Sequence, residues 1–118
     1  MLSYKIRKVG NVIIVDLTGK LIIGDATLLL REVVRTSIIN DGFRKAILNL
    51  KETTYADSSG LNEMISSWTT LRNRGGDLKL LSTSAKLIDN LQMIGFIEIF
   101  DIFDSEEKAV ASLRQSVL

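Results

Sequence analysis

The order in which apolar patterns follow one another constrains this chain more than any other feature. Strand-length apolar runs alternate with longer amphipathic segments, and the connections between them are short. The order is strand, strand and helix, followed by three further strand–helix pairs. This order predicts an α/β fold in which right-handed crossovers place the helices against one sheet. We expect a single domain over residues 1–118, with a mixed sheet of four to five strands and about four helices packed mainly on one face.

Local signals predict where these elements start and stop. The expected strands are residues 4–8, 12–17, 46–50 and 78–81, with a last strand within 96–103. Gly10-Asn11, between the first two strands, is typical of a two-residue hairpin turn. Helices are expected over residues 25–39, after Asp57, after Ser84 and after Asp104. The expected N-caps are Asp25, Asp57 and Ser84. The first three helices are expected to end at Asn40-Asp41-Gly42, Gly75-Gly76 and Gly95.

Two absent residue types narrow the chemistry. The sequence has no His and no Cys, which removes the commonest general base, thiolate chemistry and the commonest metal ligands. We therefore expect no enzymatic activity, no metal and no cofactor. The net charge is +1 and Lys and Arg form no sustained run, so we expect no direct contact with nucleic acid. There is no signal peptide and no run of roughly 20 apolar residues to span a membrane, so we expect a cytoplasmic protein.

The start of the second predicted helix carries the most informative residues. Asp57 is a candidate N-cap, because its carboxylate can accept hydrogen bonds from the exposed N–H groups of the first turn. Ser58 then falls at about the first helical position. An anion at this end of a helix is favoured by roughly 0.3–1 kcal/mol. A phosphate on Ser58 is therefore compatible with the predicted fold.

The second predicted helix has two different faces. One face is an apolar stripe at helical spacing, which we assign to the core. The opposite face is polar, and Glu63 is its only charge before Arg72. Exposed helix positions usually hold stronger helix formers, so this surface is either a docking face or an ordinary solvated one. The stripe consists of Leu61, Met64, Ile65, Trp68 and Leu71, and the polar face of Asn62, Ser66, Thr69, Thr70 and Asn73.

Four segments, taken in order, resemble one known family. They are Thr18-Gly19-Lys20-Leu21, Ile47-Leu48-Asn49-Leu50, Tyr55-Ala56-Asp57-Ser58-Ser59-Gly60-Leu61 and Gly75-Gly76-Asp77-Leu78-Lys79-Leu80. Together they resemble a STAS domain of the anti-sigma factor antagonist type over essentially the whole chain. The resemblance implies that a serine kinase, which is also the anti-sigma factor, phosphorylates Ser58. It also implies that the unphosphorylated domain binds this kinase and frees a sigma factor.

Further expectations concern the partners and the docking residues. Besides the anti-sigma factor, a phosphoserine phosphatase is an expected partner, and the domain is expected to be a monomer. The expected partner-binding residues are Asp57, Ser58, Ser59, Gly60, Asn62, Ser66 and Thr69.

Three alternatives compete with this interpretation. Ile22 stands where the family often has an acid, and Asn62 where a small residue is common, so a constitutive scaffold or an accessory subunit of a transport assembly remains open. A receiver domain with Asp57 as phosphoacceptor is disfavoured, because the first predicted strand is basic and lacks the acids that hold magnesium. A hydrolase using Ser58 or Ser59 lacks both a Gly-x-Ser-x-Gly turn and a His base.

Overall fold

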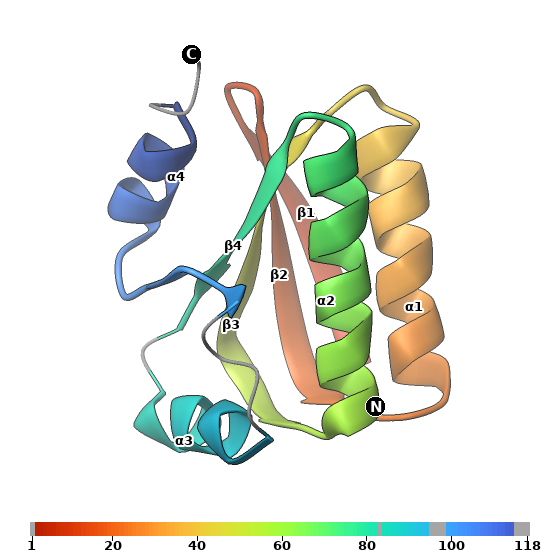
Figure 1. Ribbon diagram of the computed structural model, residues 1–118, viewed down its shortest axis with the longest axis vertical. Coiled ribbons are helices and arrows are strands. Elements are labelled where there is room, and N and C mark those ends of the chain that lie inside the picture. The colour runs from red at the N-terminus through yellow and green to blue at the C-terminus, as the bar shows by residue number, and fades with distance from the viewer. Residues whose placement is uncertain (1, 83, 95–98, 115–118) are drawn as a thin grey trace.

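The computed structural model describes residues 2–82, 84–94 and 99–114. Its centre is a five-stranded sheet with the order β1-β2-β3-β4-β5 (Figure 1). The edge strand β1 (Leu2–Val9) is antiparallel to β2 (Val12–Leu21). β3 (Lys45–Ala56), β4 (Asp77–Leu81) and β5 (Ile102–Phe103) continue the sheet in parallel pairings. The predicted mixed sheet in an α/β fold is therefore confirmed.

The helices cover the two faces of the sheet unequally. α1 (Asp25–Val33) continues into a π-helical segment, η1 (Val34–Ile39), and lies beside α2 (Ser58–Asn73) on one face (Figure 1). α3 (Ala85–Ile94) packs against the same core at one end of the sheet, whereas α4 (Glu106–Arg114) packs on the opposite face. The prediction of helices mainly on one face is confirmed, with α4 as the exception. No helix in the described ranges is long and apolar enough to cross a lipid bilayer.

β2 is buried because its two faces belong to different cores. Ile13 and Val15 face the large core under α1 and α2, whereas Val12 and Ile14 face the small core under α4. All four side chains are fully buried. A strand covered on both sides needs an apolar residue at every position, which explains the continuous Val-Ile-Ile-Val run.

β2 and β3 both extend beyond the strands that the sequence predicted. β2 continues past residue 17 to Leu21, and β3 continues past residue 50 to Ala56. The added residues are mostly polar and exposed, yet they still pair, with register shifts between Asp16 and Thr18 and between Gly19 and Lys20. As a result β3 ends immediately before Asp57, and no connecting loop separates it from α2.

Two predicted helix starts are wrong in detail. Asp25 is the first residue of α1, and the cap position belongs to Gly24, whose φ of 106° is in the region that favours glycine. α4 begins two residues after Asp104. Its cap is Ser105, whose hydroxyl oxygen accepts a hydrogen bond of 3.4 Å from the Lys108 amide. At α4 a carboxylate and a hydroxyl can both serve as the cap, so Asp104 and Ser105 could not be told apart from the sequence. At α1 the cap residue has no side chain, so it gave no capping signal.

Most of the remaining predictions of turns, caps and helix ends are confirmed, and the last strand is shorter than predicted. The turn at Gly10-Asn11 closes the β1–β2 hairpin, and Ser84 caps α3 by accepting from the Leu87 amide at 3.2 Å. The helix predicted to stop at Asn40-Asp41-Gly42 ends there, with a positive φ at Gly42. The last strand is only Ile102–Phe103, and the predicted stop at Gly95, like residues 96–98, lies outside the described residues.

A cluster of charged groups ties α4 to the sheet. The Arg7 guanidinium donates hydrogen bonds of 2.6 and 2.9 Å to Asp16 and of 2.7 and 3.1 Å to Glu106. The Asn49 amide adds a bond of 2.7 Å to Asp16. The hydrogen bonds from Arg7 hold the pKa of the Asp16 carboxyl and that of the Glu106 carboxyl below their usual values. Strands β1, β2 and β3 are thereby joined to the first turn of α4.

This cluster should make the protein sensitive to acid. Folding lowers the pKa of both carboxyls, so the stabilisation is complete above their unfolded values of about 4 and is lost as the pH falls through the folded values. Arg7→Met should melt at a lower temperature than the wild-type chain at pH 7, and the difference should shrink as the pH falls below about 5. Arg35→Met, which removes only the exposed pair with Glu32, is the control and should follow the wild type. A difference between Arg7→Met and wild type that is constant with pH would contradict this assignment.

Candidate functional site

The junction between β3 and α2 is held by the side chain of Asp57. Its Oδ1 accepts a hydrogen bond of 2.8 Å from the Gly60 amide, which confirms the predicted N-cap. Its Oδ2 accepts a second bond, of 3.0 Å, from the Ile23 amide in the loop between β2 and α1. The Asp57 amide itself donates to the Leu21 carbonyl at 3.2 Å. One carboxylate therefore fixes the helix start against the neighbouring loop.

Ser58 occupies the position that the sequence predicted. It is the first residue of α2, and its side chain is exposed, whereas the next residue, Ser59, is half-buried. A phosphoryl group on Ser58 would lie at the electropositive end of a helix, where an anion is stabilised. The hydroxyl is accessible to a second protein, and α2 is capped by Asp57 independently of it.

Gly60 has a packing role that the sequence did not indicate. It was predicted to contact the partner, but it is buried, and a Cβ at this position would overlap the Leu21 carbonyl oxygen. Only glycine therefore allows the first turn of α2 to approach the end of β2 so closely. Gly60 therefore shapes the surface around Ser58 from within the fold.

The two faces of α2 correspond largely to the prediction. Leu61, Met64 and Leu71 are fully buried, and Ile65 and Trp68 pack on the same core while half-buried. On the other side Asn62, Ser66, Thr69 and Asn73 are exposed as predicted, and spacings of three and four residues place them on one face with Ser58. Thr70 is half-buried and donates to the Ser66 carbonyl. We call the part of this face nearest the helix start, Ser58, Asn62, Ser66 and Thr69, the exposed polar stripe.

Glu63 was predicted on the polar surface, and this is wrong. Its side chain is only 6% exposed, and its Oε1 accepts hydrogen bonds of 2.8 and 3.1 Å from the Arg31 guanidinium of α1. Ser67 is buried beside it and donates to the Glu63 carbonyl oxygen at 2.8 Å. Glu63 lies on the flank of α2 between the apolar and the polar face, and α1 covers this flank. A helical projection of α2 alone does not show where α1 packs, so it could not reveal the burial of Glu63.

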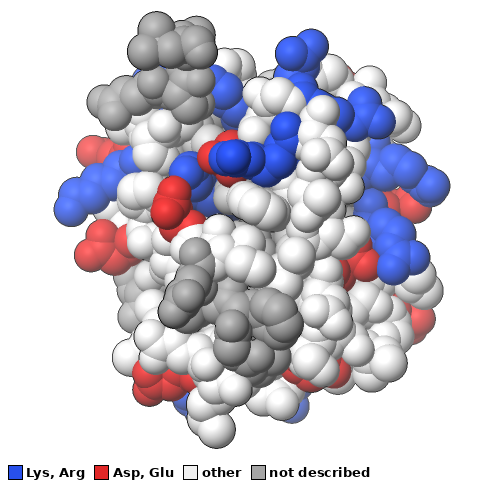
Figure 2. Space-filling model, in the orientation of Figure 1, with Lys and Arg blue, Asp and Glu red and all other residues white. Residues whose placement is uncertain are grey.

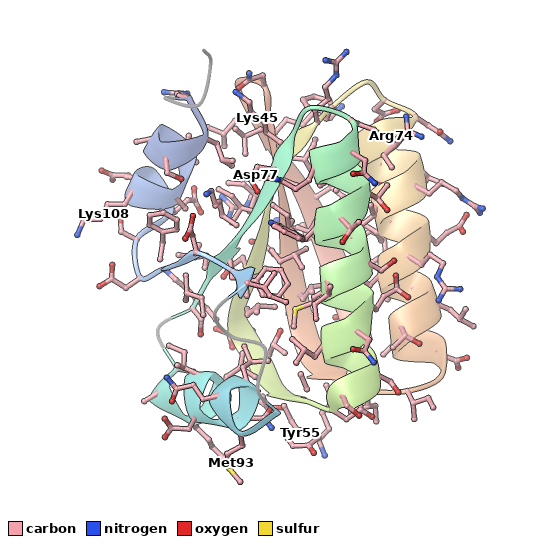
Figure 3. The ribbon with its side chains drawn as sticks, in the orientation of Figure 1. Lys45, Tyr55, Arg74, Asp77, Met93 and Lys108 are labelled. Carbon is pink, nitrogen blue, oxygen red and sulfur yellow. The ribbon has the colours of Figure 1, made fainter. Side chains whose placement is uncertain are left out.

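Several large apolar side chains are exposed at the end of the molecule where α2 begins. We define the apolar collar as Ile23, Leu28, Tyr55 and Met93, whose side chains are 72, 56, 45 and 89% exposed. Ile23 is bonded to Asp57, and Tyr55 precedes Asp57 by two residues. Figure 3 places Tyr55 and Met93 at the end of the molecule where α2 begins. In the described part of the chain, Tyr4 is the only other large apolar side chain with comparable exposure.

The comparisons with known proteins agree with this arrangement. The model of the STAS domain family matches residues 3–109. The chain is similar to the anti-sigma-B factor antagonist of Bacillus subtilis (strain 168), with 27% identity over 109 residues, 92% of this chain and 97% of that protein.

Two solved structures have the same fold. One is the anti-sigma factor antagonist SpoIIAA of Bacillus in its unphosphorylated form, at 22% identity, a TM-score of 0.71, and coverage of 95% of this chain and 98% of that one; its phosphorylated form has also been solved. The other is a sulfate transporter family protein from Wolinella succinogenes, at 25% identity, a TM-score of 0.76, and coverage of 92% and 88%. With the family model matching nearly its whole length, this chain belongs to the STAS domain family.

Proposed function

We propose that this domain is an anti-sigma factor antagonist whose binding is switched off by phosphorylation of Ser58. The observation that carries the proposal is the exposed Ser58 at the first position of α2, beside the Asp57 cap. The unphosphorylated domain binds the anti-sigma factor, which is also the serine kinase, and a sigma factor is released. A phosphoserine phosphatase reverses the modification. The domain acts in the cytoplasm as a binding module and catalyses no reaction itself.

The docking surface in this proposal combines two groups of residues. The exposed polar stripe of α2 supplies hydrogen-bonding groups, and the apolar collar supplies the area that a partner can bury. Burial of a large apolar side chain contributes roughly 1.5–3 kcal/mol, so a collar of this kind can dominate the affinity. Asp57, Ser59 and Gly60 act mainly by fixing the shape of the surface around Ser58.

The collar suggests how a phosphate at Ser58 prevents binding. Phosphorylation adds about −1.5 to −2 charges next to the Asp57 carboxylate. A partner surface that covers an apolar collar is itself mainly apolar, so it removes water from the phosphate without offering a cation in return. A cost of roughly 3–4 kcal/mol weakens binding by a few hundred-fold, which is sufficient for a switch.

The test is phosphorylation by candidate anti-sigma kinases from the same genome, followed by a binding measurement. With ATP present, we expect phosphate on Ser58 of the wild-type chain and of Ser59→Ala, and none on Ser58→Ala. The phosphorylated chain should no longer bind the kinase, whereas Ser58→Ala should bind with or without ATP. Phosphate at another residue, or undiminished binding of the phosphorylated chain, would falsify the proposed switch.

A constitutive scaffold or accessory subunit is the second candidate. It is supported by the similarity to a sulfate transporter family protein and by Ile22 and Asn62, where the antagonists often differ. In that case no kinase modifies Ser58, and one partner binds the wild-type chain, Ser58→Ala and Ser58→Asp with equal affinity.

Substitutions in the apolar collar should weaken partner binding and leave the fold intact. Ile23→Ser and Tyr55→Ser each remove exposed apolar area, and we expect the affinity for the anti-sigma factor to fall by about tenfold or more. Tyr4→Ser is a matched control, because Tyr4 and Tyr55 are both 45% exposed and only Tyr55 belongs to the collar. Binding by surface plasmon resonance checks the prediction. If the three variants all bind as the wild type does, the collar is not part of the docking surface.

A further inference from the structure

The end of the molecule opposite Ser58 carries an excess of positive charge. Ser58 and Arg74 lie at the two ends of α2, about 24 Å apart along the helix. Figure 2 shows Lys and Arg gathered over the upper end, and Figure 3 places Arg74 there, far from Tyr55 and Met93. We call this region the basic end. Among the described residues, contacts within this region place there six cations and two acids. They are Lys8, Arg44, Lys45, Arg72, Arg74 and Arg114, and Asp41 and Asp77.

Three of these cations have a structural partner, and three do not. Arg72 lies 3.5 Å from Asp77, Lys45 donates to the Leu113 carbonyl at 2.8 Å, and Lys8 lies over the Phe43 ring at 5.5 Å. In the described part of the basic end, the side chains of Arg44, Arg74 and Arg114 are exposed and have neither an ion pair nor a hydrogen bond. Arg44 and Arg74 lie close to each other, in two neighbouring loops. Their charges contribute nothing visible to holding the fold together.

The two loops that carry these arginines are fixed against each other. The Asp77 amide donates a hydrogen bond of 3.1 Å to the Arg44 carbonyl oxygen. Gly76 packs so closely on the same carbonyl that a Cβ there would overlap it. The Phe43 amide, in turn, donates to the Ile38 carbonyl at 2.8 Å. The backbone of both loops is therefore preorganised, and binding would order only the side chains.

A groove of about 430 Å³ lies between these loops. Two unpaired guanidinium groups and the Asn73 amide can donate hydrogen bonds into it, and none of its side chains is acidic. Guanidinium groups bind carboxylates in a bidentate manner, so the groove suits a carboxylate-bearing ligand. Its residues are Ile39, Gly42, Phe43, Arg44, Asn73 and Arg74.

From these observations we propose that the basic end binds an acidic polypeptide segment, at a site separate from the Ser58 surface. A membrane is a poorer fit, because the exposed large apolar side chains of the described residues lie elsewhere and none is available for insertion at this end. A nucleic acid duplex is also a poorer fit, because the two arginines that line the groove neutralise few phosphates. An acidic peptide needs only a few cations and an amide donor. The domain can then hold two proteins at once, one at each end of α2.

The test uses a short labelled peptide rich in Glu and Asp and two doubly substituted full-length chains. Arg44→Glu with Arg74→Glu removes the proposed site. Lys20→Glu with Lys86→Glu makes the same change in net charge with exposed residues away from the basic end. We expect the wild type and the lysine variant to bind the peptide with equal affinity and the arginine variant to bind at least about tenfold more weakly. Added salt should weaken the binding. Melting curves confirm that both variants are folded.

Three outcomes would overturn the proposal. The first is that the wild-type chain does not bind the peptide, and the second is that both variants bind the peptide equally weakly. The third is that anionic lipid vesicles or a DNA duplex bind in an arginine-dependent way, whereas the peptide does not bind. The arginine variant should still bind the anti-sigma factor, since the Ser58 surface is untouched. Failure of this second site is therefore distinguishable from failure of the proposed function.

Discussion

Ser58→Asp should bind the anti-sigma factor at least about a hundredfold more weakly than Ser58→Asn, and concentrated salt should not close the gap. The two side chains have nearly the same size, so their ratio isolates the effect of the charge. A carboxylate at position 58 must lose its water when a partner covers it together with the apolar collar, and dissolved ions do not restore that loss. Repulsion by an acidic partner would instead be screened by salt, because at 1 M salt the Debye length is only about 3 Å.

The measurement is calorimetric titration of both variants at low and at high salt. A ratio that stays large at high salt supports desolvation by the apolar collar. A ratio that collapses at high salt would assign the switch to repulsion by acidic groups of the partner. Equal affinity of the two variants at every salt concentration contradicts the switch itself and favours a constitutive scaffold.

Gly60→Ala should destabilise the domain by about 3 kcal/mol, although the same substitution inside an ordinary helix is stabilising by roughly 0.5–1 kcal/mol. The new Cβ would overlap the Leu21 carbonyl oxygen. That oxygen cannot easily move, because it accepts the hydrogen bond from the Asp57 amide. Either the first turn of α2 or the end of β2 must shift, and the cap at Asp57 shifts with it.

Urea unfolding of Gly60→Ala, with Asn62→Ala as the control, checks this expectation. Asn62 is exposed in the same helix, and alanine there should be neutral or slightly stabilising. If Gly60→Ala were as stable as the control, the close approach of α2 to β2 would not exist in solution.

The fold class could be predicted because the apolar pattern is unambiguous where helices cover the sheet. The fully buried run of residues 12–15 has no polar member, and it marks a central strand. The apolar pattern stops where the helices no longer cover the sheet. Glu52 and Thr54 in the outer half of β3 are exposed, and backbone pairing with β2 keeps them in the strand without any apolar signal.

The candidate site was predictable only where its chemistry is local. The capping of α2 by Asp57 depends on residues that are adjacent in sequence, so position and role could both be inferred. The burial of Glu63 depends on where α1 packs, and the exposure of Ile23 and Met93 depends on what covers them in the folded chain. Such properties arise from contacts between distant segments, which a single sequence does not display.

The separate roles of Asp57 and Ser58 bear on how reversible the proposed modification would be. Asp57 caps α2 and anchors the Ile23 loop, so a phosphate on Ser58 would not be carried by the residue that maintains the helix start. In the proposed switch, a kinase would add the phosphate and a phosphatase would remove it while the backbone stays folded. No refolding step would then limit the rate of the response.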